Sequence, residues 1–274
     1  MERTLKEYRD YLYECEKSES TVKKYLRDAE NFLDFCKGQE IGRGIILEYK
    51  ESLAQGYERS GANSMLCALN SYLTFIGKDD LHVKLFRIQK KVFCPEEREL
   101  TRQEYQRLVK AARSSKNTRL SLVLQTICAT GMRVSELSAV TVESAMRGEA
   151  TVSCKGKTRS ILLIDELCKK LLQYAKDRGI TEGCIFITRN GRPLDRSNIW
   201  REMKELCREA GVNEKKVFPH NLRHLFARIF YEGEKDIAAL SDILGHSSIN
   251  TTRIYIISSG KAHRRKMENM NLLI

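Results

Sequence analysis

The segment that decides both the fold and the chemistry runs from Pro219 to Tyr255 and reads PHNLRHLFARIFYEGEKDIAALSDILGHSSINTTRIY. His220 and Arg223 are three residues apart, so a helix here would present both on one face. His246 follows a Leu-Gly pair, 23 residues after Arg223, and Tyr255 comes nine residues later. The segment therefore holds four side chains that bind phosphate or transfer protons, at fixed spacings.

Two shorter segments upstream carry residues of the same kind. ATGMRVSEL (129–137) places Arg133 just after a glycine and at the start of a helical pattern, with Glu136 three residues further on to orient it. SCKGKTRSILL (153–163) alternates as two strands around a tight turn, which puts Lys155 at the tip of a hairpin. Lys157 and Arg159 follow in the same hairpin and are candidates for contacts with a nucleic acid.

Together these residue types suit metal-free transfer of a phosphodiester to a tyrosine. Attack on the phosphodiester builds negative charge on its non-bridging oxygens, and the guanidinium forks of Arg133 and Arg223 can stabilise that charge in place of a metal ion. A tyrosine hydroxyl, with a pKa of about 10, needs a nearby base, which His220 can supply. Lys155 is a suitable general acid for the leaving oxygen. The sequence contains no compelling carboxylate or His/Cys cluster for a metal, so we expect no metal and no other cofactor.

Each of these motifs is weak when taken alone. Tyr255 is one of eleven tyrosines, and a His-x-x-Arg pair or a Lys-Gly-Lys turn is common on protein surfaces. The ordered combination is what favours a catalytic interpretation. We interpret the remaining histidines as structural or surface residues, namely His82, His224 and His263.

Charge and cysteine usage narrow the class of protein. The net charge is +12, and its distribution is uneven: residues 1–92 carry 16 Lys and Arg against 15 Asp and Glu, whereas residues 93–274 carry 32 against 21. Such a basic surface attracts DNA. Nine cysteines without a Cys-x-x-Cys pair indicate neither a disulfide framework nor a zinc site. With no apolar run of about 18 residues, these features predict a cytoplasmic protein without a membrane span.

Hydrophobic periodicity predicts a mainly α fold with a small antiparallel β-sheet. Four amphipathic helices within residues 4–76, the second capped by Ser20, form a helical domain over 1–90. A linker over 91–98 leads to an α+β domain over 99–274, which opens with a capping box at Thr101. Residues 185–187 are expected to form a short strand, and residues 261–274 a tail helix.

The four motifs together resemble those of the tyrosine recombinase (phage integrase) family, and the resemblance covers the whole chain. It implies that Arg133 and Arg223 hold the phosphate, that Lys155 is the acid, and that Tyr255 is the nucleophile. By the same resemblance His220 and His246 are acid–base and hydrogen-bonding groups. The helical N-terminal part is similar to the SAM-like core-site-binding domain of the family. We expect no extra arm-binding domain before it, so that the chain resembles the compact Xer-type and simple mobile-element members.

The resemblance also implies partners and a reaction. The protein is expected to act as a tetramer on double-stranded DNA, with itself or with a related recombinase, and to exchange strands through a 3′-phosphotyrosine. DNA integration, excision, inversion and dimer resolution all remain open. Two other functions stay open as well: a DNA-binding regulator of recombinase descent without catalysis, and DNA relaxation like that of a type IB topoisomerase.

Overall fold

The computed structural model describes residues 4–88, 99–154, 157–256 and 268–270. The chain divides into two compact units, Met1–Lys90 and Lys91–Ile274. The expected linker over 91–98 lies outside the described residues, as does all of the expected tail helix except residues 268–270. None of the helices in the described part of the chain has the length and apolar character that crossing a bilayer requires.

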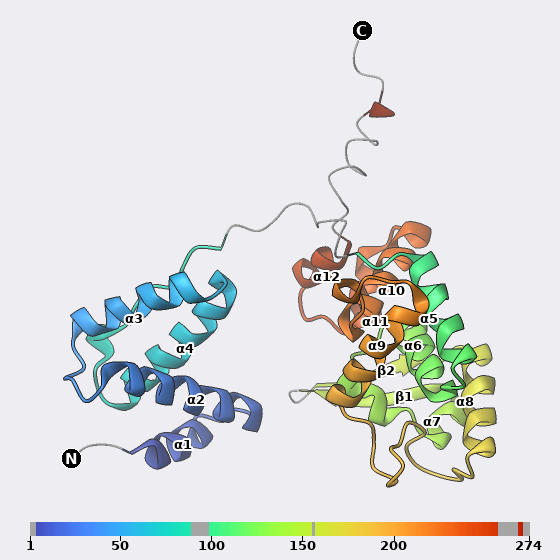
Figure 1. The fold of residues 1–274 in the computed structure, drawn as a ribbon, viewed down its shortest axis with the longest axis horizontal. Coiled ribbons are helices and arrows are strands. Elements are labelled where there is room, and N and C mark those ends of the chain that lie inside the picture. Colours follow the sequence, from blue (N-terminus) through green and yellow to red (C-terminus); the bar gives the residue numbers. More distant parts are fainter. Residues whose placement is uncertain (1–3, 89–98, 155–156, 257–267, 271–274) are drawn as a thin grey trace. The chain divides into compact units, whose positions relative to one another are not determined.

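The first unit is a bundle of four helices (Figure 1), α1 (Leu5–Glu14), α2 (Glu19–Cys36), α3 (Arg43–Gly56) and α4 (Arg59–Phe75), followed by the short 3-10 turn η1 (Asp79–Leu81). Their amphipathic faces meet in one core built around side chains such as Tyr8, Leu12, Phe32, Leu66 and Leu73. The predicted cap of the second helix is wrong by two residues. Ser18 caps α2 instead of Ser20, because the Ser18 side chain accepts the backbone hydrogen bond of Thr21.

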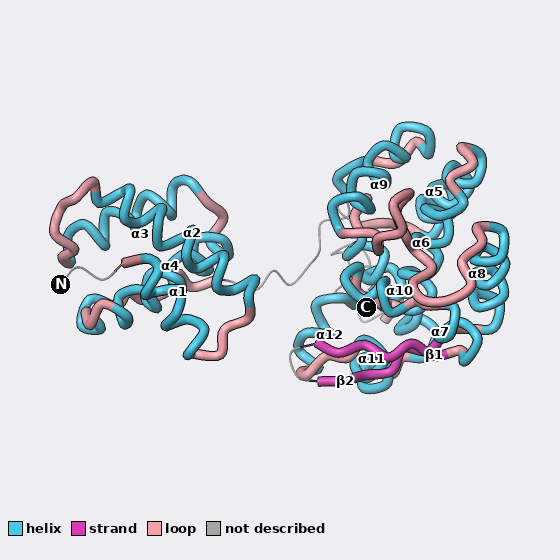
Figure 2. The backbone as a smooth tube through the Cα atoms, turned by 90° about the horizontal axis from the view of Figure 1, so that it is seen from below, coloured by secondary structure: helices cyan, strands magenta, loops and turns pink. Residues whose placement is uncertain are grey.

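The second unit is also mainly helical, and its described residues include a two-stranded sheet (Figure 2). In chain order its elements are α5 (Arg102–Ser114), α6 (Thr118–Thr130), η3 (Val134–Ala139), α7 (Val142–Arg147), β1 (Glu149–Cys154), β2 (Lys157–Leu162), α8 (Asp165–Asp177), α9 (Arg196–Ala210), η4 (Glu214–Lys216), α10 (Pro219–Glu234), α11 (Ile237–Leu244) and α12 (Ile249–Ile256). A mainly α fold with a small antiparallel sheet is thus confirmed.

Helix α6 is the centre of the second unit. It is buried along most of its length and contacts α5, α8, α9 and α10. The helix ends at Gly131, whose backbone takes a left-handed conformation with φ +64°. A side chain at this position would meet the ring of Phe226 and the side chain of Leu244 at 2.4–2.8 Å. Glycine is therefore required where α6 passes α10 and α11, and this crossing is where the site residues converge.

Strands β1 and β2 pair antiparallel, with Val152 opposite Arg159. Within the hairpin, Val152 and Ile161 point into the core, as expected for alternating apolar residues in a half-buried sheet. The predicted strand over 185–187 is wrong, because this segment makes only isolated bridges, Thr141 with Cys184 and Ile187 with Pro193. Ile185 and Phe186 are buried within an irregular loop, so their hydrophobicity reflects burial and not pairing with a neighbouring strand.

Candidate active site

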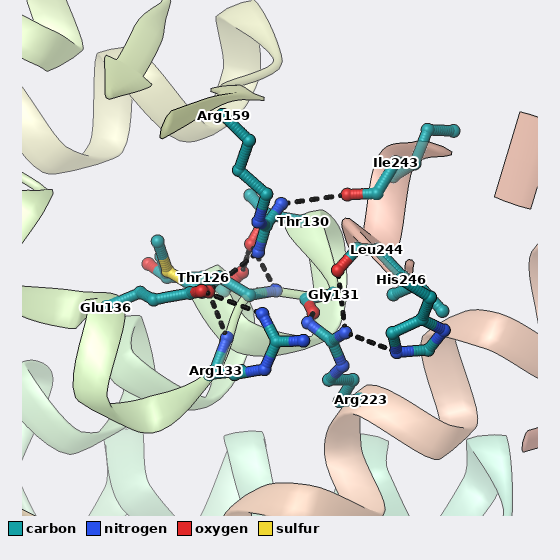
Figure 3. A network of polar contacts seen from close by, with 11 residues as sticks. Thr126, Thr130, Gly131, Arg133, Glu136, Arg159, Arg223, Ile243, Leu244 and His246 are labelled. Carbon is teal, nitrogen blue, oxygen red and sulfur yellow. Dashed lines mark hydrogen bonds and ion pairs between the residues drawn. The ribbon is translucent and has the colours of Figure 1, made fainter. Parts of the chain in front are cut away.

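The first turns of α10 position His220 and Arg223. Pro219 occupies the first turn of this helix, where the missing N–H costs nothing. Arg223 points inward and is only 1% exposed. Its Nη1 donates to the carbonyl of Gly131 at 2.6 Å, and its Nη2 donates to the carbonyl of Leu244 at 2.8 Å (Figure 3). The guanidinium thus joins the ends of α6 and α11, two helices whose last carbonyls lack partners within the helix.

His246 continues this network from the turn after α11. Its Nε2 lies 2.8 Å from the Nη2 of Arg223, and its Nδ1 lies 2.8 Å from the hydroxyl of Thr252. Because a guanidinium can only donate, Nε2 of His246 accepts from Arg223, and Nδ1–H of His246 donates to the hydroxyl oxygen of Thr252. Thr252 is fully buried on α12, so the orientation of the imidazole is fixed from both sides.

Tyr255, also on α12, lies among three histidines and is 7% exposed. Its ring stacks on that of His224, with centroids 4.2 Å apart and planes 20° apart. The rings of His246 and His220 lie 5.0 and 5.2 Å away, and the guanidinium of Arg223 lies 5.7 Å from the ring centre. The tyrosine is therefore held beside one guanidinium and three imidazoles.

Arg133 lies at the start of η3 and is paired with Glu136. The guanidinium donates to Oε1 of Glu136 at 3.0 Å, and the backbone N–H of Arg133 donates to Oε2 at 2.7 Å. The Arg133 side chain keeps 35% exposure, whereas that of Glu136 keeps 7%. Glu136 therefore holds an arginine whose side chain remains accessible from outside the protein.

Burial and positive charge lower the pKa values of the imidazoles. Desolvation, followed by the charges of Arg223 and Arg133, lowers the pKa of His246 to about 4. Desolvation and then the neighbouring His220 lower the pKa of His224 to about 4. The pKa of His220 is also lowered, first by desolvation and then by Arg223 and Arg133. These rings are consequently neutral near pH 7, and a neutral imidazole can accept a proton.

Arg223 keeps its charge in spite of its burial. Desolvation and the nearby Arg133 lower its pKa to about 10, and interaction with Tyr255 opposes that change. A positive charge at this depth, close to a second arginine, favours a bound anion. Within the described residues, no group of three or more His, Cys, Asp or Glu side chains is arranged to hold a metal ion.

The structure brings together most of the residues that the sequence singled out. Arg133, Glu136, His220, Arg223, His246 and Tyr255 share one site, built from η3, α10, α12 and the turn after α11. Lys155 lies outside the described residues, and so does the side chain of Lys157. Arg159 is described, and its guanidinium contacts protein groups within the site.

Sequence reasoning missed two residues that contact the predicted set. His224 stacks on Tyr255, and Thr252 holds His246. For His224 a signal was available, because it follows His220 by four residues and hence lies on the same face of α10. Thr252 gave no comparable signal, since its role depends on the bend between α11 and α12.

A model of a known protein family matches most of the second unit. The model of the phage integrase family matches residues 98–261, which is more than half of the chain and includes every residue of the site. The chain belongs to the phage integrase family. This assignment agrees with the resemblance seen in the four sequence motifs.

Relatives and solved structures are similar to this chain over most of its length. Tyrosine recombinase XerA of Pyrococcus furiosus is 29% identical over 277 residues, covering 98% of this chain and 94% of the relative. A crystal structure of XerA recombinase is similar over 98% of both chains, with 28% identity and a TM-score of 0.55. A lambda integrase tetramer bound to a Holliday junction has a TM-score of 0.73 at 20% identity, over 92% of this chain and 75% of that one. This last likeness concerns the fold alone.

Proposed function

We propose that this protein is a site-specific DNA recombinase that cuts and rejoins DNA strands through Tyr255. The observation that carries the proposal is the position of the Tyr255 ring, 5.0 Å from His246, 5.2 Å from His220 and 5.7 Å from the guanidinium of Arg223. A tyrosine in such surroundings has imidazoles that can act as a base and a guanidinium beside it. Membership in the phage integrase family and the likeness to XerA support the same reaction.

In the proposed reaction the oxygen of Tyr255 attacks the phosphorus of a DNA phosphodiester. The bond between phosphorus and the 5′-oxygen breaks, and a 3′-phosphotyrosine and a free 5′-hydroxyl result. His220, which is neutral near pH 7, takes the proton of the tyrosine. Lys155 gives a proton to the 5′-oxygen. The 5′-hydroxyl of another strand then attacks the phosphotyrosine and gives its proton to Lys155, and Tyr255 leaves with a proton from His220. One phosphoester bond forms as another breaks, so neither ATP nor a metal ion is required.

Arg133 and Arg223 hold the scissile phosphate in this proposal. Arg133 is partly exposed and fixed by Glu136, and Arg223 keeps its charge in a buried position. Each bidentate contact stabilises the charge that develops on the phosphate oxygens, and removal of one such donor from an active site costs about 100- to 1000-fold in rate. His246 accepts a hydrogen bond from Arg223 and thereby sets the direction of its fork.

The proposed partner is double-stranded DNA at a specific core site, which the helical first unit and the catalytic unit would bind together. We expect a homotetramer on DNA, or a heterotetramer with a related recombinase. Support comes from the lambda integrase structure, which is a tetramer on a Holliday junction. DNA as the substrate, and seven free cysteines among the described residues, favour the cytoplasm.

A covalent-trapping experiment tests the proposal. A binding site is first selected from a random library of duplex DNA, and a nicked version is prepared that loses a short fragment after cleavage. Wild-type protein should give a protein–DNA band that survives denaturation, and Tyr255→Phe should bind the same DNA without forming it. Binding without any covalent band would favour a DNA-binding regulator. Relaxed circles without recombinant joints would favour a topoisomerase.

A further inference from the structure

Arg159 lies on β2 and bridges two parts of the site that are far apart in the sequence. Its Nη2 donates to Oε2 of Glu136 at 2.7 Å, and its Nη1 donates to the carbonyl of Ile243 at 2.9 Å. Figure 3 shows the side chain reaching from its strand towards both acceptors. The Arg159 side chain is 17% exposed, and its two Nη groups are directed into the protein.

The contact with Glu136 extends to Arg133. Oε2 of Glu136 accepts from both Arg159 and the backbone of Arg133, while Oε1 accepts from the Arg133 guanidinium. A carboxylate that is 7% exposed is thus held by donors from two arginines. If Arg159 were removed, one side of this carboxylate would lose its partner, and Glu136 could turn together with the guanidinium that it orients.

The contact with Ile243 extends to Arg223 and His246. Ile243 lies in the last turn of α11, where helix carbonyls have no partner within the helix. The next carbonyl, that of Leu244, accepts from Arg223, and His246 follows two residues later. Arg159 therefore fixes the end of the helix from which the Leu-Gly-His turn begins.

Gly245 gives Arg159 the space for this bridge. A Cβ at Gly245 would lie 2.2 Å from Cδ and 2.7 Å from Nε of Arg159, closer than any side chain could tolerate. The backbone there also has φ +62°, which favours glycine. The arginine of the hairpin and the glycine of the turn are thus matched in shape.

We infer that Arg159 is a positioning residue that aligns the two phosphate-binding arginines with each other. Through Glu136 it sets Arg133, and through Ile243 it sets the turn that holds Arg223 and His246. This inference rests on the proposed recombinase function. It gives Arg159 a role through protein groups, in place of the contact with DNA that the sequence suggested, because its two Nη atoms donate to Glu136 and to Ile243.

The chain contains a matched control, Arg119. It donates to the carboxylate of Glu202 at 2.8 Å and to the carbonyl of Ile187 at 2.9 Å, and its side chain is 20% exposed. In both arginines the Nε is buried without a hydrogen-bond partner among the described residues. Arg119 bridges α6 and α9, and none of its hydrogen bonds within the described part of the chain goes to a site residue. The two arginines share one bonding pattern, and only Arg159 lies in the site.

The test compares Arg159→Met, Arg159→Lys and Arg119→Met on the selected DNA site. For each variant we would measure thermal stability, the dissociation constant for DNA at several salt concentrations, and the first-order rate of covalent complex formation at saturating protein. Arg159→Met should lower the rate about 100-fold, the size of effect that misplacement of a reacting group by roughly 1 Å produces. Arg119→Met should lose similar thermal stability and keep its rate within about threefold, since it disturbs no site residue.

Arg159→Lys keeps the charge and serves as the better-folding variant. One ammonium cannot reproduce the planar fork that reaches both acceptors, so its rate should lie well below that of the wild type. In an Arg133→Lys background, Arg159→Met should cost much less than it does alone, because residues that act through one another are not additive. A residue with only a structural role would show the same cost in both backgrounds.

Two results would overturn the inference. One is a rate for the Arg159 variants equal to that of Arg119→Met at equal stability. The other is a defect confined to DNA affinity, with the slope of log K against log salt reduced by about 1, as the loss of a phosphate contact predicts. Failure of the proposed function is a separate outcome, because the wild-type protein would then form no covalent complex at all.

Discussion

Nη2 of Arg223 and Nε2 of His246 lie 2.8 Å apart, although the residues are 23 positions apart in the chain. The same Nη2 also donates to the carbonyl of Leu244, two residues before the histidine. The arginine therefore both orients the imidazole and closes the end of α11. A buried guanidinium with this many protein contacts is preorganised, so it need not rearrange when charge develops on a phosphate.

Arg223→Lys should be nearly as damaging as Arg223→Ala. A single ammonium cannot donate to Gly131 and Leu244 and also present a fork to two phosphate oxygens. We expect covalent complex formation at saturating protein to fall by about 100-fold or more in both variants. Band intensity on denaturing gels over time measures this rate. A lysine variant that cleaves within a few-fold of the wild type would refute the proposed phosphate contact.

Gly131→Ala should destabilise the catalytic unit and lower activity, because the new methyl group would meet Phe226 and Leu244 at a left-handed backbone position. We expect a loss of roughly 2–4 kcal/mol, from about 1 kcal/mol of backbone strain plus 1–3 kcal/mol of overpacking. Gly211→Ala is the control, since it ends α9 at φ +60° with nothing within 4 Å of the added methyl. It should lose only the strain. Denaturant unfolding of both variants measures the difference, and equal losses would contradict the packing argument.

Lys155→Ala should severely slow cleavage of ordinary DNA, because the 5′-oxygen then leaves without a proton. A 5′-bridging phosphorothiolate substrate needs far less protonation on departure, so it should recover most of the rate. The two substrates are compared in single-turnover reactions, with Lys157→Ala alongside as the control. Equal defects on both substrates would remove Lys155 from the role of acid, and substrate-dependent rescue of Lys157→Ala would transfer that role to Lys157.

Acidification should destabilise the catalytic unit through His224 and His246. Both have a pKa of about 4 in the folded protein, whereas a histidine in the unfolded chain has a pKa of about 6.5. Between these values the unfolded chain binds protons that the folded chain does not, so stability is complete above about pH 6.5 and is lost towards pH 4. The melting temperature should therefore fall between pH 7.5 and 5.

Replacement of both histidines isolates their share of this pH dependence. The double variant His224→Asn, His246→Asn should have a lower melting temperature at pH 7.5 and a smaller further drop by pH 5. Carboxylates also titrate at lower pH, which is why the comparison stops at pH 5. An identical drop in the variant and the wild type would show that these two rings do not carry the effect.

Much of the fold followed from local patterns. The capping box at Thr101 and the hairpin around Lys155 were both predicted from neighbouring residues, because caps and alternation depend on a few adjacent positions. The prediction of a strand over residues 185–187 was wrong, because strand formation also depends on segments that are distant in the sequence. The apolar residues of this segment fill the core from a loop, and whether a buried segment forms a ladder depends on the strands available beside it.

The sequence by itself determined the family and the set of chemical groups, since ordered spacings of Arg, His and Tyr are properties of the chain. Only the tertiary structure decided how those groups are held. The bridge of Arg159 between Glu136 and Ile243, the stack of His224 on Tyr255 and the support of His246 by Thr252 join segments that α6, α10 and α11 bring together. Contacts of this kind depend on packing between helices, and local sequence patterns do not specify which side chains will meet there.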